Sequence, residues 1–203
     1  IAGSLLVRED ADLAGLFGAI MDSREAFGID DADLGRDVFR NEVFKSELNK
    51  RIRAFQIVEY KPDHFVLTSV FARMGSSVTT EDLRDFVDAA IEFMEPGRPY
   101  SVKSLRKAGF AHPVFDLGDV VALAGDFFFG SLIATGYVGD RVKMTSCNGT
   151  SFFGRRSGQL SMPDVVAWEA GHMDMATEDA LLERLADEHG VEMARPLLRA
   201  LLK

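Results

Sequence analysis

Along this chain the spacing of apolar residues changes twice from that of helices to that of β-strands, and this order limits the folds that the chain can adopt. Apolar residues first recur every three or four positions in three stretches between residues 13 and 55, the spacing of one helix face. Residues 56–60 and 65–71 are instead rich in β-branched and aromatic side chains, and the Lys61-Pro62-Asp63-His64 between them is typical of a turn. We therefore expect three helices followed by a β-hairpin.

A second stretch repeats this order. Thr79 can cap a helix whose apolar residues run at helical spacing from 83 to 94, and further helices are predicted over 101–108 and 119–129. Two strand-like runs then meet at Asn148-Gly149, a dipeptide that strongly favours a two-residue hairpin turn. The order is again three helices and a hairpin.

A third stretch contains three more predicted helices, which begin near Pro163, Thr177 and Pro196, and no hairpin follows them before Lys203. The pattern divides the chain into a unit at 1–75, a unit at 76–158 and a helical, truncated unit at 159–203. The expected fold class is α+β and mostly helical. Because the sequence opens on Ile1 and stops within a helical pattern, we interpret it as part of a longer protein.

Three helices followed by a hairpin resemble the winged-helix branch of the helix-turn-helix superfamily. The resemblance lies in element order over most of the 203 residues, and no residue motif narrows it to one family. In winged-helix proteins the third helix often reads the major groove of DNA and the hairpin contacts the backbone, while many members bind proteins instead. The resemblance implies tandem winged-helix-like units that bind macromolecules.

The net charge of −9 argues against a protein that coats nucleic acid, yet the basic residues are concentrated. Residues 36–53 hold six basic groups against three acids. On the predicted third helix, four polar residues lie opposite the apolar stripe; Lys and Arg suit phosphates, and Asn can pair with adenine. We predict nucleic-acid contacts for this set, with a solvated helix face as the alternative: Lys45, Asn49, Lys50 and Arg53.

The second basic stretch, residues 98–107, holds four basic groups and no acid. Helical spacing places Lys103, Arg106 and Lys107 on one side of a short helix. They either clamp a nucleic-acid backbone or pair with the acidic flanks of neighbouring units, and the sequence slightly favours the pairing. By contrast, residues 119–129 contain two Asp and no Lys or Arg, so that helix would be repelled by phosphates.

Residues 120–129 are apolar on nearly all sides of the predicted helix. Such a helix is usually buried on more than one side, so we expect it to lie wedged between two units. The alternative is an exposed Phe129 patch that contacts a protein partner. The nine acids of residues 161–192 give the last unit an acidic surface, suited to a basic protein partner.

No motif for catalysis stands out. The sequence lacks a glycine-rich phosphate loop and a zinc-protease or serine-hydrolase signature. His172 lies two residues before Asp174 but has no third ligand nearby, so we interpret it, like His189, as a histidine at a helix C-terminus. Cys147 has no evident activating base. We predict no enzyme activity, metal, cofactor or small-molecule substrate; an unfamiliar enzyme is the third alternative.

No apolar run approaches the roughly 20 residues that span a bilayer, and the first residues do not form a signal peptide. With one cysteine, the chain is expected in the reducing cytoplasm, without a membrane partner. The leading functional prediction is a DNA-binding or transcription-associated module. The alternative is a protein-interaction or assembly scaffold of the same fold, whose partner is another protein or the remainder of a longer chain.

Overall fold

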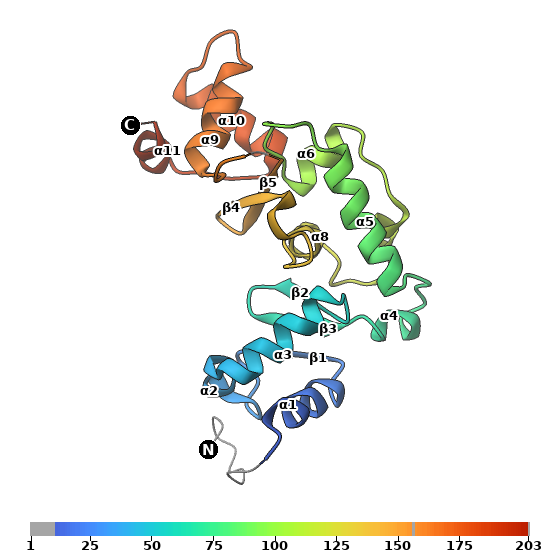
Figure 1. The fold of residues 1–203 in the computed structure, drawn as a ribbon. Helices are drawn as coiled ribbons and strands as arrows, with labels where there is room; N and C mark the ends of the chain where they lie inside the picture. The colour runs from blue at the N-terminus through green and yellow to red at the C-terminus, as the bar shows by residue number, and fades with distance from the viewer. Residues whose placement is uncertain (1–10, 156, 203) are drawn as a thin grey trace.

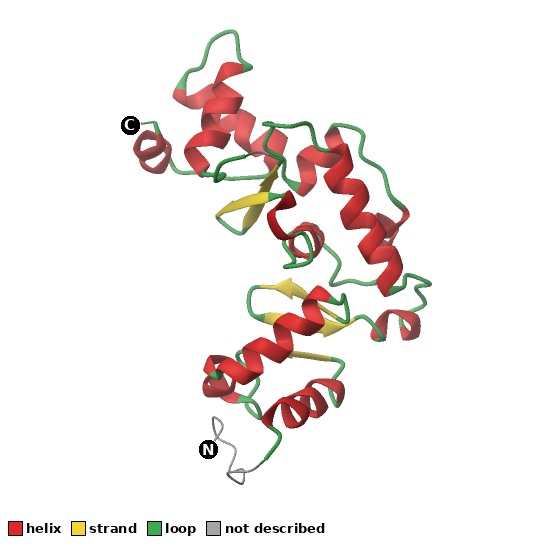
Figure 2. Ribbon diagram, viewed as in Figure 1, coloured by secondary structure: helices red, strands yellow, loops and turns green. Residues whose placement is uncertain are grey.

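A computed structural model describes residues 11–155 and 157–202. The fold is α+β and mostly helical, with 52% helix, 13% strand and two small antiparallel sheets, as Figure 2 shows. We refer to residues 11–75 as the N-terminal segment, 76–158 as the middle segment and 159–202 as the C-terminal segment. The three follow one another along the molecule in Figure 1. In the described residues, no helix is long and apolar enough to cross a membrane.

The N-terminal segment contains the expected three helices and hairpin. Asn41 begins the third helix, because its side-chain oxygen accepts hydrogen bonds from the backbone N–H groups of Val43 (2.9 Å) and Phe44 (3.3 Å). Its elements are α1 (Leu13–Asp22), β1 (Ala26–Gly28), α2 (Gly35–Arg40), α3 (Glu42–Arg53), β2 (Ile57–Lys61), β3 (His64–Leu67) and α4 (Val70–Arg73).

Two features of this segment differ from the prediction. β3 ends at Leu67, and the residues expected to extend it to 71 turn instead into the short helix α4. The strand β1 was not predicted, since its three residues form a strand only by pairing with β3, nearly 40 residues later in the chain. The resulting antiparallel sheet has the order β1-β3-β2, with the last strand in the centre.

The middle segment begins with two helices whose starts are fixed by local hydrogen bonds. The side chains of Thr79 and Asp82, and of Ser101 and Ser104, form reciprocal capping boxes. Its elements are α5 (Thr80–Phe93), α6 (Val102–Lys107), the 3₁₀ helix η1 (Pro113–Asp116), α7 (Leu117–Val120), α8 (Asp126–Ile133), the 3₁₀ helix η2 (Gly139–Arg141), β4 (Lys143–Cys147) and β5 (Thr150–Gly154).

The single helix predicted over 119–129 is wrong. The chain leaves the helical conformation at Val121 and folds back, so α7 and α8 are separate helices. Gly118 permits this turn, because a Cβ there would lie 2.9 Å from the carbonyl oxygen of Ala124. Backbone packing of this kind leaves no trace in hydrophobic spacing.

The hairpin predicted at Asn148-Gly149 is confirmed. Both residues have positive φ, 48° and 80°, as a tight hairpin turn between twisted strands requires. On its other edge β5 pairs with Tyr100, through reciprocal backbone hydrogen bonds of 2.8 and 2.7 Å between Tyr100 and Phe153. Tyr100 pairs with β5 as β1 pairs with β3, so β5, like β3, has a backbone partner on each side.

One strand of each hairpin, β2 in the first and β5 in the second, buries apolar side chains on both of its faces. Successive residues of a strand point to opposite sides. In β2, Ile57 joins the core of the N-terminal segment while Val58 joins the large core of the middle segment. In β5, Phe153 joins that large core while Phe152 joins the core of the C-terminal segment. Each hairpin therefore supplies the surface on which the next segment packs.

The C-terminal segment consists of three helices: α9 (Met162–Gly171), α10 (Glu178–His189) and α11 (Arg195–Leu201). Gly190 ends α10 in the left-handed conformation (φ 75°), which glycine adopts without steric cost. Leu181, Leu185 and Leu198 pack with Phe152 of β5 to form the third core.

Helix α8 lies at the centre of the molecule, packed against β2 on one side and against β5, α5 and α6 on the others (Figure 1). Phe128, Phe129, Leu132 and Ile133 are at most 1% exposed. The predicted wedge between two units is confirmed, although its helix is α8. The alternative of an exposed Phe129 patch is wrong, because that side chain is buried.

Truncating Phe129 to alanine should lower the free energy of unfolding by about 3–5 kcal/mol, since a buried ring is replaced by a cavity between α8 and its neighbours. Urea denaturation followed by circular dichroism measures this loss. The matched control is Phe93→Ala, the same change at a ring that is 36% exposed, where we expect a smaller loss. Equal losses for the two variants would contradict a central role for α8.

Candidate nucleic-acid interface

Helix α3 is held to α1 by one arginine. The guanidinium of Arg51 binds both carboxylate oxygens of Asp22 in α1 and donates from Nε to Glu47 Oε1 at 3.0 Å. These hydrogen bonds lower the pKa of both carboxyl groups below their ordinary values. Arg51 is therefore used inside the segment, where it pairs with Asp22 and shares Glu47 with Lys50.

The outward face of α3 is polar and exposed along its length. Phe44 and Leu48 are buried on the opposite face. Ser46, which sequence analysis did not single out, lies on the exposed face and adds a hydroxyl group. The exposed face has three cations, one acid and one apolar side chain, and consists of Glu42, Val43, Lys45, Ser46, Asn49, Lys50 and Arg53.

The two lysines of this face are free to meet phosphates. Lys45 Nζ lies 2.7 Å from Glu42 Oε1, and Lys50 Nζ lies 3.3 Å from Glu47 Oε2. Lys50 in particular keeps 76% of its side chain exposed. An exposed ion pair such as Lys45–Glu42 is worth ~0–1 kcal/mol, so a phosphate group can replace that carboxylate.

Arg53 marks the end of this face, where α3 meets the middle segment. Its side chain lies over the backbone of Gly136, and a Cβ at position 136 would lie 2.6 Å from Arg53 Nε. Of the four residues predicted on α3, Lys45, Asn49 and Lys50 lie on the open part of the helix, and Arg53 lies at the junction.

The predicted residues of α6 contact other parts of the chain. Lys103 Nζ donates to the backbone carbonyl of Ala186 at 2.9 Å, and Lys107 Nζ binds Glu188 Oε1 at 2.9 Å, both in α10. Arg106 binds Asp126 at 3.2 Å. The favoured sequence interpretation, pairing with the acidic flank of a neighbouring unit, is confirmed for Lys107.

The two predicted basic groups do not form one continuous stripe. Arg106 binds Asp126 at the first residue of α8, whereas Arg53 packs on Gly136, just beyond its last turn. The eight residues of α8 span about 12 Å, so the groups lie at opposite ends of that helix. Only the α3 face remains as an open basic surface of the predicted set.

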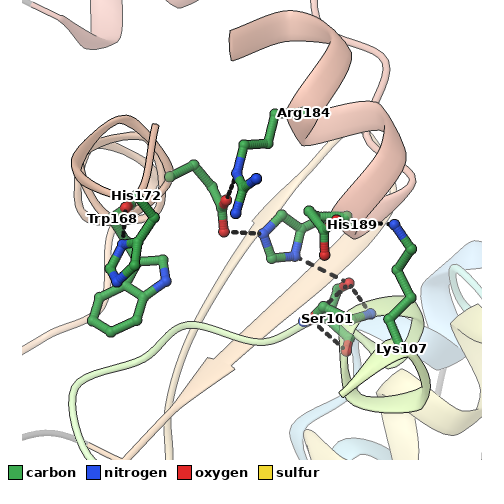
Figure 3. A network of polar contacts seen from close by, with 9 residues as sticks. Ser101, Lys107, Trp168, His172, Arg184 and His189 are labelled. Carbon is green, nitrogen blue, oxygen red and sulfur yellow. Dashed lines mark hydrogen bonds and ion pairs between the residues drawn. The ribbon is translucent and has the colours of Figure 1, made fainter. Parts of the chain in front are cut away.

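A buried polar network connects α6 with α9 and α10 (Figure 3). His189 Nε2 lies 3.0 Å from Glu169 Oε1, and its Nδ1 lies 3.3 Å from Ser101 Oγ. Arg184 binds the second oxygen of Glu169. Ser101, Glu169 and His189 are each less than 5% exposed. His189 does end α10 as predicted, but its buried partners, Ser101 and Glu169, lie on other elements and have no local signal in the sequence.

The charge state of Glu169 follows from its partners. Burial acts to raise the pKa of this carboxyl group, but the hydrogen bonds from His189 and Arg184 outweigh that effect and hold the pKa below its ordinary value. An ionised carboxylate only accepts hydrogen bonds, so Nε2 of His189 carries a proton toward it. When the ring is neutral, Nδ1 accepts from the Ser101 hydroxyl.

The hydrogen-bonded series Ser101–His189–Glu169 resembles that of a catalytic serine, but its position in the fold is that of a buried structural contact. Ser101 is 1% exposed, and its oxygen also accepts the backbone N–H of Ser104 (3.2 Å) as the cap of α6. A nucleophile must reach its substrate and have its lone pair free. We therefore assign the network a structural role, joining the middle and C-terminal segments.

His172 and Cys147, the other residues considered for catalysis or metal binding, have structural surroundings that explain them. The ring of His172 stacks on Trp168 with centroids 4.3 Å apart, and its Nδ1 donates to the Trp168 carbonyl at 2.7 Å. Burial raises the pKa of Cys147, which disfavours its thiolate. Across residues 11–155 and 157–202, no three His, Cys, Asp or Glu side chains are grouped to hold a metal ion.

Comparison with known proteins adds no family. No protein-family model matches the chain, and no curated protein or solved structure matches it significantly. The resemblance to winged-helix proteins consequently rests only on the order and pairing of the helices and strands.

Replacing Glu169 by glutamine should destabilise the protein at pH 7 by about 1.5–3 kcal/mol, the worth of hydrogen bonds to a charged group. Because the pKa of Glu169 is lowered on folding, its contribution is present above the ordinary carboxyl range and is lost as pH falls through the folded pKa. The difference from wild type in urea unfolding should therefore shrink between pH 7 and about pH 3.5. Glu183→Gln, at an exposed position of α10, is the control. A pH-independent difference would contradict an ionised Glu169.

Proposed function

We propose that this chain is a non-catalytic, macromolecule-binding protein built from tandem winged-helix-like units, and that its N-terminal segment contacts DNA. The order of elements from α1 to β3, and a sheet whose last strand is central, support the winged-helix assignment. The middle segment repeats that order, with Tyr100 in the position of β1. A role in transcription follows from the same resemblance.

The outward face of α3 carries the proposal. A third helix that precedes a hairpin is the element that enters the major groove in this fold. Here that helix exposes Lys45, Lys50 and Arg53 for phosphates, and Asn49 and Ser46 for base edges. One acid, Glu42, lies at its first turn.

The corresponding helix of the middle segment cannot act in the same way. α8 is buried against β2, and its first residue is the acid Asp126. The second face of the β2-β3 hairpin is covered by the same contact, so of this hairpin only the turn around the exposed Lys61 is open. DNA contact is therefore proposed for one surface of one segment.

The alternative function is a protein-interaction or assembly scaffold that does not bind nucleic acid. It is favoured by the use of Lys103 and Lys107, which bind α10 rather than an external partner. The acidic C-terminal segment would then receive a basic protein partner. Under this alternative, the cations of α3 also meet carboxylates rather than phosphates.

Fluorescence anisotropy with a labelled random-sequence DNA duplex separates these functions. We expect binding at low salt that weakens as salt rises, because phosphate contacts release counterions. The Lys45→Ala/Lys50→Ala variant removes two such contacts and should make the slope of log K against log salt shallower by about 2. The matched control is Arg195→Ala/Arg199→Ala, two exposed, acid-paired arginines far from α3, with the same change of charge.

Equal weakening by both double variants would show that net charge, and not the α3 face, governs binding. Absence of wild-type binding at low salt would remove the DNA proposal. A pull-down in which the α3 variant loses a protein partner, while the α11 control keeps it, would then support the scaffold.

A further inference from the structure

Three arginines come together where the end of α3 meets the middle segment. Arg53 is the last residue of α3, Arg84 lies in α5 and Arg141 ends η2. All three residues are exposed, and the side chain of Arg53 lies against the backbone of Gly136. We call them the junction arginines. They belong to three separate elements, so their grouping is a property of the fold.

The ring of Tyr137 holds the junction arginines of the middle segment in place. The guanidinium carbon of Arg84 lies 5.7 Å from the centre of this ring, and that of Arg141 lies 5.0 Å from it. Phe55, just beyond the end of α3, contacts Tyr137 edge-on with ring centres 5.2 Å apart. Aromatic faces attract cations without using their N–H groups. The guanidinium groups are therefore positioned at the surface by the rings below them.

The positive charge of this group is only partly compensated. Asp88 binds Arg141 Nη1 at 2.6 Å, and it accepts the hydroxyl group of Tyr137 at 2.6 Å. Neither Arg53 nor Arg84 makes a hydrogen bond or an ion pair within the described residues. Three positive charges thus meet one negative charge, which leaves a surplus of two.

Such a surplus is out of keeping with the rest of the chain. The sequence has 32 acids against 23 Lys and Arg, and most arginines of the described chain form ion pairs with acids. Like charges held close together repel each other, and an anion supplied from outside removes that repulsion. The planar guanidinium group, with several N–H donors in a fixed geometry, suits phosphate oxygens in particular.

The surplus charge continues the open face of α3, because Arg53 belongs to both. The 12 residues of α3 span about 18 Å, whereas the major groove of DNA is about 12 Å wide. If the first turns of a recognition helix meet base edges, its last turn lies near the phosphates that border the groove. Arg84 and Arg141 lie beside that last turn.

We propose that the junction arginines bind the phosphate backbone of DNA at the edge of the groove that α3 enters. This inference rests on the proposed function and deepens it, because it adds Arg84 and Arg141 of the middle segment to the contact surface. The binding surface then crosses the joint between the two segments, and the packing of α8 on β2 fixes its shape.

The first test measures one arginine against a matched one. In the salt titration with labelled duplex DNA, Arg84→Gln should make the slope of log K against log salt shallower by about 1, the effect of one lost phosphate contact. The control is Arg98→Gln, which removes the same charge and a similar contact, since Arg98 lies 4.7 Å from the ring centre of Tyr100 but pairs with Glu95. We expect the control to bind as the wild type does.

The second test predicts a gain of binding, which a misfolded variant would not give. Asp88→Asn removes the carboxylate that compensates Arg141 and keeps an oxygen for the Tyr137 hydroxyl. It should therefore tighten DNA binding several-fold at low salt and steepen the salt dependence. Asp187→Asn, the same change at an exposed position of α10, should leave both unchanged.

Equal effects of each variant and its control would overturn the proposal, because net charge alone would then explain binding. If Lys45→Ala/Lys50→Ala weakens binding but Arg84→Gln does not, the junction arginines are excluded and the DNA contact of α3 stands. Absence of wild-type binding removes both proposals. If polyglutamate displaces the labelled duplex as well as unlabelled DNA of equal charge does, the arginines bind carboxylates and the assignment to phosphates is overturned.

Discussion

The arrangement of the three segments depends on two strands, β2 and β5, that bury apolar side chains on both faces. Antiparallel sheets in small domains commonly leave one face to water. Here Ile57 and Val58 enter different cores, and so do Phe152 and Phe153. Adjacent apolar residues on a strand point in opposite directions, so each hairpin completes its own segment and begins the packing of the next.

Much of this fold can be predicted from local signals, and the parts that cannot are those set by distant contacts. Helix α5 is predicted by its capping residue Thr79 and its apolar stripe, and the second hairpin is predicted by Asn148-Gly149. The strand β1 exists only through its pairing with β3, and the break between α7 and α8 depends on Gly118 packing against Ala124. Neither the strand β1 nor the break between α7 and α8 can be predicted from the spacing of apolar residues.

The candidate surfaces show the same division. Helical spacing placed Lys45, Asn49 and Lys50 on one exposed face, because a face opposite a buried stripe is a local property. It also placed Lys103 and Lys107 together, but their partners in α10 lie more than 80 residues away. The sequence locates a stretch of basic residues, but only the tertiary fold determines whether those residues pair with acids of the same molecule.

The two segments that share an element order have opposite uses for their third helix. α3 is polar outside and apolar inside, so one face is open, whereas α8 is apolar on nearly all sides and is enclosed. The polar face of α3 therefore stays open to solvent, whereas α8 connects the N-terminal and middle segments through its packing on β2. Because α8 packs on β2, directly beside the end of α3, anything that shifts α8 also shifts the border of the open face.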